Sequence, residues 1–208
     1  KTALNFGLII KKLFPDKIVV IGGNNGIIMF KEFLTAGAAD FIVFYEGENT
    51  LKTLIENITA PELVPNIAYL KNGEIIKTRA AANFDINDNF FKLDFIDADK
   101  YRIGKVKSIS IVASRGCPYN CGFCSANFNV FKYTLKNINI FKFELEYNIT
   151  KFDIGALNIE DDNFTLNREY AANICEFIKT KFTNLKLFFM NGLHYKRLDS
   201  KILKYLAA

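Results

Sequence analysis

The sequence predicts an α/β protein, because short buried strands alternate with amphipathic helices along most of its 208 residues. Half of the residues are hydrophobic, which is enough to bury a core, and no apolar run approaches the roughly 20 residues that cross a bilayer. The net charge of +5 comes from basic residues interleaved with acidic ones, so we expect neither a membrane nor nucleic acid as a partner. No signal-peptide pattern opens the chain, and it begins at Lys1, so we expect a fragment of a cytoplasmic protein.

Residues 1–60 alternate helix and strand in the manner of a parallel, doubly wound sheet. Hydrophobic periodicity predicts helix Ala3–Leu13, strand Lys17–Ile21, helix Gly26–Ala36, strand Phe41–Phe44 and helix Thr50–Ile58, the last with Asn49 as N-cap. Gly22 and Gly23 follow the first strand, where glycines let the backbone approach a ligand closely. A tight turn without a ligand would need the same two glycines.

Residues 61–107 form the expected boundary between two domains. Two short apolar runs, Ile67–Leu70 and Ile75–Thr78, flank Asn72-Gly73 and predict a β-hairpin with a tight turn. The segment from Ala80 to Arg102 is rich in Asn and Asp and has no sustained period, so we expect a linker that lies over a surface.

Residues 108–208 return to alternation and predict three strand-and-helix units. The expected elements are strand Ser108–Ala113, a helix within Asn137–Thr150, strand Ala156–Ile159, helix Arg168–Lys181, strand Lys186–Met190 and a helix from Ser200. A complete eightfold barrel needs about 250 residues, so this segment is at most the opening of one.

Three of the four cysteines, Cys117, Cys121 and Cys124, lie within eight residues directly after a predicted strand. Pro118 and Gly122 disfavour regular helix between them, and soft thiolate ligands select zinc or iron–sulfur centres. A structural zinc site wants four protein ligands, but Cys175 lies on the apolar face of a predicted helix and is better explained by core packing. Three ligands on a cubane cluster would leave one iron open for a substrate or cofactor.

The segment Ser-Arg-Gly-Cys-Pro-Tyr-Asn-Cys-Gly-Phe-Cys-Ser, residues 114–125, closely resembles the cluster motif of radical S-adenosylmethionine (SAM) enzymes that carry an N-terminal cobalamin-binding domain. The resemblance implies that the three cysteines hold a [4Fe-4S] cluster and that Phe123 lies near the adenine of SAM. It further implies reductive cleavage of SAM to a 5′-deoxyadenosyl radical. The implied fold is the C-terminal half of a doubly wound, Rossmann-like cobalamin-binding domain followed by the first three βα units of a partial TIM barrel.

Polar residues follow the second and third strands of this implied barrel, at the edge where barrel active sites lie. Asp161 and Asp162, within a segment that resembles the Asp-Asp-Asn-Phe of the same group, could hold the amino group or ribose of SAM. A solvated loop that caps the next helix would explain them as well. Asn191 or His194 could reach SAM or substrate, although a lone histidine is more often structural or exposed.

The segments 15–23 and 40–51 resemble the second half of a cobalamin-binding domain, and Gly22 and Gly23 would then lie against cobalamin. Relatives usually carry a histidine and a hydroxyl residue where Asn25 and Ile27 stand, and a glycine in place of Tyr45. No histidine precedes position 194, so a histidine-ligated cobalt is excluded within this segment. Cobalamin binding therefore stays open.

We expect a radical SAM enzyme that acts on a small molecule, by methyl transfer or ring rearrangement, and receives electrons from a flavodoxin or ferredoxin. One rival is a tRNA methylthiotransferase, but its N-terminal domain normally supplies three further cysteines, and none precedes Cys117. Another rival is a zinc-stabilised binding module without catalysis. A fragment that is inactive by itself is a third outcome.

Overall fold

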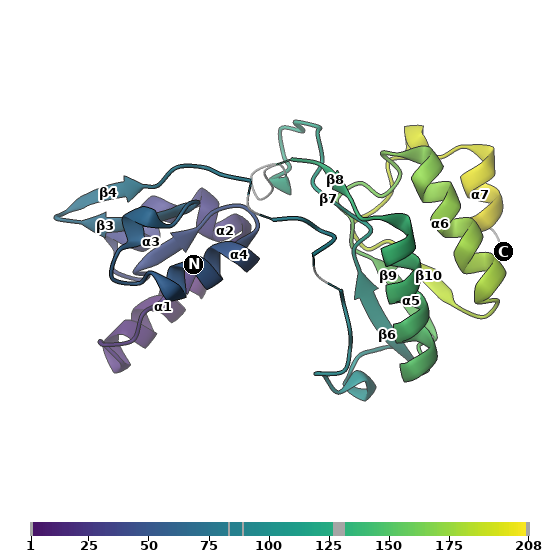
Figure 1. Cartoon of the computed structure of the whole chain (residues 1–208), viewed down its shortest axis with the longest axis horizontal. Helices are drawn as coiled ribbons and strands as arrows, with labels where there is room; N and C mark the ends of the chain where they lie inside the picture. The colour runs from purple at the N-terminus through teal and green to yellow at the C-terminus, as the bar shows by residue number, and fades with distance from the viewer. Residues whose placement is uncertain (1, 83, 89, 127–131, 207–208) are drawn as a thin grey trace. The chain divides into compact units, whose positions relative to one another are not determined.

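The computed structural model describes residues 2–82, 84–88, 90–126 and 132–206 of a mixed α/β chain (Figure 1). The chain divides into two compact units, Lys1–Phe84 with Pro118–Phe131, and Asp85–Cys117 with Lys132–Ala208. The predicted α/β class is confirmed, whereas the predicted division at 61–107 stays a prediction. None of the helices in the described ranges is long and apolar enough to span a membrane.

The first unit is built on a four-stranded sheet in the order β1-β2-β3-β4. Strands β1 (Val20–Ile21) and β2 (Phe41–Val43) are parallel, as predicted. Strands β3 (Ile67–Lys71) and β4 (Glu74–Lys77) form the predicted hairpin, and β3 pairs antiparallel with β2. The hairpin therefore extends the sheet of the N-terminal segment and makes it a mixed sheet.

The helices of this unit are α1 (Thr2–Leu13), α2 (Gly23–Ile28), α3 (Phe30–Thr35) and α4 (Gly47–Glu56), followed by the 3-10 turn η1 (Pro61–Leu63). The prediction of one continuous helix over residues 26–36 is wrong. The backbone of Met29 leaves helical geometry, with φ −105° and ψ 24°, and the first helix already begins at Gly23.

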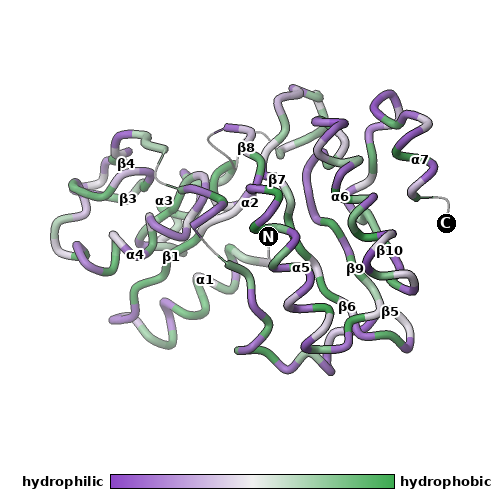
Figure 2. The backbone as a smooth tube through the Cα atoms, turned by 45° about the vertical axis from the view of Figure 1, so that its right-hand side comes forward, coloured by the Kyte–Doolittle hydropathy of each residue, from purple (hydrophilic) through white to green (hydrophobic). Residues whose placement is uncertain are grey.

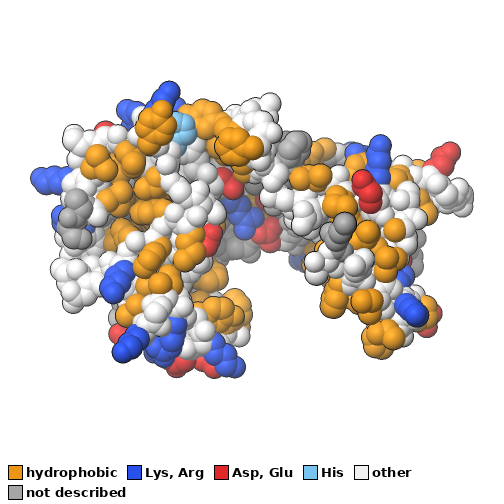
Figure 3. Space-filling model, turned by 180° about the vertical axis from the view of Figure 1, so that it is seen from behind, with side chains coloured by type: hydrophobic (Ala, Val, Ile, Leu, Met, Phe, Trp, Pro, Cys, Tyr) orange, Lys and Arg blue, Asp and Glu red, His pale blue; other side chains and the backbone are white. Residues whose placement is uncertain are grey.

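Helix α1 packs on the rest of the unit through Gly7. An ideal Cβ at this position would lie 2.2 Å from the backbone oxygen of Ala38, so only glycine allows this approach. The apolar side chains of Phe6, Leu13 and Phe14 are exposed. Figure 3 draws the hydrophobic side chains on one face of the chain in orange.

The second unit contains a four-stranded sheet in the order β10-β9-β6-β5. Strands β6 (Val106–Ile111), β9 (Ala156–Ile159) and β10 (Lys186–Phe188) are parallel, and β5 (Arg102–Ile103) pairs antiparallel with β6. The third parallel strand ends two residues before the predicted Met190. A separate short ribbon joins β7 (Ser114–Arg115) to β8 (Thr134–Leu135).

The apolar sides of helices α5 (Ile138–Phe152) and α6 (Arg168–Lys181) share one core with the sheet, which explains the alternating hydropathy along both helices in Figure 2. Asn137 and Asn167 cap these helices with side-chain hydrogen bonds. The short turn η4 (Tyr195–Arg197) and helix α7 (Ser200–Leu206) follow β10.

Residues 91–94 of the predicted linker lie along α5. In the described part of this linker, the 3-10 turn η2 (Ala98–Lys100) is the only regular element before β5. Glu144 accepts a hydrogen bond from the backbone of Phe91, and the Oδ1 atom of Asn148 accepts one of 2.9 Å from the backbone of Leu93. Glu144 also forms a buried ion pair with Lys136, with a distance of 2.7 Å between Oε2 and Nζ. The linker is thus fastened to its own unit by buried polar side chains.

Candidate functional site

The candidate site begins where the parallel strands β6 and β9 end. Three successive residues after β9, Asp161, Asp162 and Asn163, each bond to the segment that leads from β6 to the first cysteine. Because the carboxyl ends of parallel strands share one edge of the sheet, residues 46 to 48 positions apart meet here.

Asp161 holds the start of this segment. Its Oδ1 accepts a hydrogen bond of 2.7 Å from the backbone of Ala113, and its Oδ2 accepts one of 2.5 Å from the hydroxyl of Ser114. Only 2% of Asp161 is exposed. Burial raises the pKa of this carboxyl to about 6, and the two hydrogen bonds oppose that rise only in part.

Asp162 holds the next turn of the segment. Its Oδ2 accepts a hydrogen bond of 3.1 Å from the backbone of Gly116, whose φ of 86° lies in the left-handed region that favours glycine. Burial raises the pKa of Asp162 as well, while this hydrogen bond and the charge of Arg115 lower it. The two acids therefore bind the backbone before Cys117; their predicted contact with SAM stays a prediction.

Asn163 reaches the first cysteine itself. Its Nδ2 donates a hydrogen bond to the Sγ atom of Cys117 across 3.7 Å, and only 5% of Asn163 is exposed. Cys117 is partly buried and its thiol is free. Sequence reasoning placed Asn163 in the acidic segment but gave it no role.

Cys121 and Cys124 are exposed and their thiols are also free. Two hydrogen bonds within the described residues join them to near neighbours: the backbone of Cys124 donates to the oxygen of Cys121 across 3.0 Å, and that of Ala126 donates to the Cys124 sulfur across 3.5 Å. Phe123 between them is 95% exposed. Among the described residues, no three Cys, His, Asp or Glu side chains lie close enough together to hold a metal ion.

Two tyrosines that the sequence did not indicate complete the buried end of the site. The hydroxyl of Tyr170 donates to the backbone oxygens of Ala113 and Lys136, at 3.1 and 2.7 Å. Burial raises the pKa of Tyr170 and of Tyr133, and the charge of Asp161 raises both further. No local pattern in the sequence marks either residue.

The predicted residues Asn191 and His194 follow β10, and Asn191 is bonded to the end of β9. The Oδ1 atom of Asn158 accepts a hydrogen bond of 3.0 Å from the backbone of Met190, and Asn191 donates one of 2.9 Å to the backbone oxygen of Glu160. Asn191 thus lies at the end of β9, next to the acidic segment. The ring of His194 stacks on that of Tyr195 with centroids 6.0 Å apart.

In the first unit, Gly22 and Gly23 form the turn between β1 and α2, and Gly23 has a φ of 75°. The next residue, Asn24, donates a hydrogen bond of 3.3 Å to the hydroxyl of Ser125, which follows the last cysteine. Tyr45 has a φ of 59°, so the tyrosine stands in a backbone conformation that glycine adopts more easily. The predicted contact of the two glycines with cobalamin stays a prediction.

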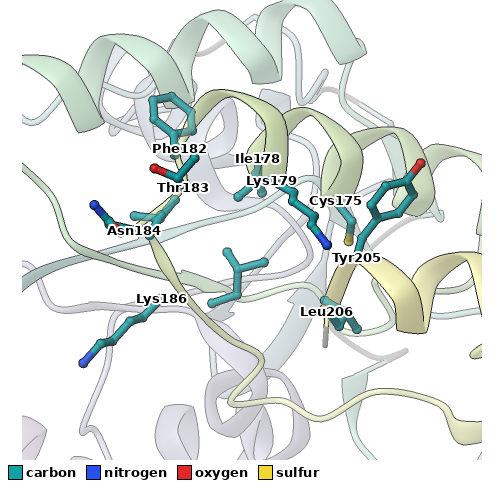
Figure 4. A pocket seen from close by; sticks show the side chains of 11 residues that line it. Cys175, Ile178, Lys179, Phe182, Thr183, Asn184, Lys186, Tyr205 and Leu206 are labelled. Carbon is teal, nitrogen blue, oxygen red and sulfur yellow. The ribbon is translucent and has the colours of Figure 1, made fainter. Parts of the chain in front are cut away.

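Cys175 is buried in the core of the second unit, as predicted, and burial raises its pKa to about 12. It lines a pocket of about 470 Å³ together with Phe182, Tyr205 and the start of β10 (Figure 4). This pocket lies at the N-terminal end of β10, opposite the edge that carries the candidate site.

A scan of the sequence against models of known protein families finds no match. Solved structures give the fold. TsrM from Kitasatospora setae, a radical SAM methyltransferase with cobalamin and a [4Fe-4S] cluster bound, matches with a TM-score of 0.75 and 17% identity, over 99% of this chain and 42% of TsrM. OxsB, a cobalamin-dependent SAM radical enzyme with aqua-cobalamin and SAM bound, matches with a TM-score of 0.61 and 19% identity, over 88% of this chain and 27% of OxsB. The chain therefore has the fold of cobalamin-dependent radical SAM enzymes.

The sequence is also similar to those of curated enzymes. The chain is 30% identical over 181 residues to an uncharacterized methyltransferase of Pyrococcus horikoshii. It is 29% identical over 177 residues to the anaerobic magnesium-protoporphyrin IX monomethyl ester cyclase of Synechocystis sp.. Each match covers 82% of this chain, but only 39% and 36% of the relatives, respectively. The predicted resemblance to this group of enzymes is confirmed.

Proposed function

We propose that this chain is the cluster-binding part of a cobalamin-dependent radical SAM enzyme, with the thiolates of Cys117, Cys121 and Cys124 as the ligands of a [4Fe-4S] cluster. The observation that carries the proposal is the set of three free thiols within eight residues after β6, in a chain with this fold. When bound, the cluster supplies the electron for reductive cleavage of SAM to a 5′-deoxyadenosyl radical.

The donor set suits this cluster better than zinc. Soft thiolates favour both centres, but a structural zinc ion wants a fourth protein ligand. Cys175, the remaining cysteine, is 1% exposed within an apolar core, and its raised pKa opposes the thiolate form that metal binding requires. The three available thiolates therefore suit a [4Fe-4S] cluster that has one iron without a protein ligand.

The other site residues take supporting roles in this proposal. The exposed ring of Phe123 offers a flat apolar face for the adenine of SAM, and Asn191 offers an amide at the end of β9. Asp161 and Asp162 hold the backbone that precedes Cys117. Gly22 and Gly23 leave their turn open enough for close approach of cobalamin, since a Cβ at Gly23 would meet nothing within 4 Å.

For the whole protein we propose methyl transfer to a small molecule, because relatives and structural neighbours include methyltransferases. Ring formation is the second candidate, favoured by the resemblance to the cyclase. Electrons would come from a flavodoxin or ferredoxin, and the free thiols suit the reducing cytoplasm.

Anaerobic reconstitution with iron and sulfide tests the cluster. We expect brown absorbance in the native chain and in Cys175→Ala, which serves as the control, and its loss in Cys117→Ser, Cys121→Ser and Cys124→Ser. A colourless chain that holds one zinc ion would contradict the proposal. Release of 5′-deoxyadenosine from SAM after reduction of the reconstituted protein then tests the chemistry.

A further inference from the structure

The side chain of Asn24 links the paired-glycine turn of the first unit to the segment that carries the second and third cysteines. Its Nδ2 atom donates a hydrogen bond of 3.3 Å to the hydroxyl of Ser125, 101 positions further along the chain. Asn24 directly follows Gly22 and Gly23, and Ser125 directly follows Cys124. Both ends of the bond belong to the first unit, which includes residues 118–131.

This bond fixes the orientation of the Asn24 amide. Among the described residues, the hydroxyl of Ser125 is its one hydrogen-bond partner. The Oδ1 atom of Asn24 is buried without a partner in the same part of the chain, although a buried amide normally satisfies both its nitrogen and its oxygen. The side chain of Asn24 is therefore held in place by the end of the cysteine loop.

The cysteine loop depends on this bond because little packing holds the residues before it. Residues 121–124 are all exposed, so their path is only weakly fixed by contacts with the core. Asn24 and Ser125 are partly buried, so water competes less with a hydrogen bond between them. The bond thus helps to fix the position of the loop just after Cys124.

The glycine turn depends on the same bond. A Cβ at Gly23 would meet nothing within 4 Å, so this side of the turn is open to a large ligand and has few contacts that hold it. A site that is free to move binds its ligand more weakly, in proportion to the fraction of molecules in the binding conformation. The bond to Ser125 restrains Asn24 and so raises that fraction.

We infer that Asn24 is a positioning residue that couples two cofactor sites. Its bond to Ser125 holds the glycine turn in the conformation that binds cobalamin, and bound cobalamin in return orders the loop at Cys124. The second effect follows from the first, because coupling between two sites is reciprocal. The inference rests on the proposed binding of cobalamin at Gly22 and Gly23.

Equilibrium dialysis of the metal-free chain against methylcobalamin in the dark gives the first test. We expect Ser125→Ala to weaken binding about fivefold, the effect of losing one ordinary hydrogen bond. This substitution leaves every residue of the turn in place, so a bond that served only the shape of the loop would leave the affinity unchanged. Asn24→Ala should weaken binding by a similar factor, and the double variant by no more than either single one.

Two further variants control this test. Ser125→Thr keeps the hydroxyl and should bind methylcobalamin as the native chain does. Gly122→Ala alters the same loop at a position where a Cβ meets nothing within 4 Å, and should also leave the affinity unchanged. Native affinity in Ser125→Ala, or an equal loss in Gly122→Ala, would overturn the inference.

Chymotrypsin cleavage after Phe123 gives the second test and needs only the native chain if the variants do not fold. The side chain of Phe123 is 95% exposed, and the rate of cleavage reports how often the loop opens. Saturating methylcobalamin should slow this cut about fivefold in the native chain and less than twofold in Asn24→Ala. An unchanged rate in the native chain would overturn the inference, and so would equal slowing in both chains, which would mean that methylcobalamin shields the loop directly.

Neither test needs iron or sulfide, so this inference and the proposed cluster fail separately. A chain that binds no methylcobalamin would overturn the inference and leave the three cysteines as cluster ligands. A chain that shows the expected affinities but forms no cluster on reconstitution would support the role of Asn24 and contradict the proposed cluster.

Discussion

The first cysteine of the loop and the last two are held in different ways. Asp161 and Asp162 bond to the backbone before Cys117, and Asn163 bonds to its sulfur. Cys121 and Cys124 are exposed, and within the described part of the chain their hydrogen bonds join residues 121–126. The folded chain thus holds the thiol of Cys117 in place and leaves the thiols of Cys121 and Cys124 exposed.

Further hydrogen bonds hold the backbone at Ala113, where the segment before Cys117 begins. The backbone oxygen of Ala113 accepts hydrogen bonds from the backbone of Lys136, at 2.9 Å, and from the hydroxyl of Tyr170. Lys136 is in turn paired with Glu144, and both side chains are almost wholly buried. Substitutions along this support should therefore cost more stability than substitutions among the exposed cysteines.

The largest effect is expected for Glu144→Ala. It leaves the Lys136 ammonium buried and unpaired, which typically destabilises a protein by about 3–5 kcal/mol. Glu146→Ala on the same helix removes an exposed pair with Lys181 and should cost about 0.5 kcal/mol or less. Urea unfolding of both variants checks the difference, and equal losses would contradict it.

Asp161 should produce the next largest effect, as a dependence of stability on pH. Its pKa is about 6 in the folded chain, above the ordinary 3.8, so its favourable contribution is present below about pH 4 and is lost as pH rises through about 6. Relative to Asp161→Asn, the native chain should lose about 2–3 kcal/mol between pH 4 and pH 7. Urea unfolding at several pH values measures this loss. A difference in the free energy of unfolding between the native chain and Asp161→Asn that stays constant from pH 4 to pH 7 would rule the raised pKa out.

Two glycines of the loop should respond differently to alanine. Gly116→Ala forces a φ of 86° on an L-residue and should cost about 1–2 kcal/mol. Gly122→Ala should change stability by less than about 0.5 kcal/mol, because a Cβ there meets nothing within 4 Å and its φ is not in the left-handed region. Thermal unfolding of the metal-free variants distinguishes the two positions, and the prediction fails if Gly122→Ala costs as much.

The smallest effects are expected for the cysteines themselves. In the metal-free chain, Cys121→Ser and Cys124→Ser should alter stability by less than about 0.5 kcal/mol, since both residues are exposed. Cys117→Ala removes the acceptor of the bond from Asn163 and should cost about 1 kcal/mol. Differential scanning calorimetry checks the order, which would be wrong if all three variants lost the same stability.

Sequence patterns predicted the parts of this chain that depend on local chemistry. The hairpin follows from Asn72-Gly73, which take the two left-handed conformations of its turn. Strand β9 and helix α6 lie where hydrophobic periodicity placed them, and Cys175 is in the core. The cysteine motif itself indicated the class of enzyme.

The patterns did not reveal contacts between segments far apart in the chain. Asn163 and Cys117 are 46 positions apart, and Glu144 and Phe91 are 53 positions apart, so no local period marks either pair. One such contact did leave a trace in the sequence. Glu144 and Asn148 are polar residues four positions apart on the otherwise apolar, buried face of α5, a pattern that indicates buried polar partners. The break at Met29 had no such signal, since Met29 is itself a good helix former and neither neighbour, Ile28 or Phe30, is a glycine or proline.

Hydrogen exchange measures the difference between the two ends of the loop most directly. In the metal-free chain, the backbone amides of Ala113 and Gly116 donate hydrogen bonds to Asp161 and Asp162, so their protons should exchange slowly. The amide proton of the exposed Cys124 should exchange fast. After anaerobic reconstitution with iron and sulfide, the amide of Cys124 should become slow as well. Equal exchange at both ends before reconstitution, or a Cys124 amide that stays fast afterwards, would contradict the account.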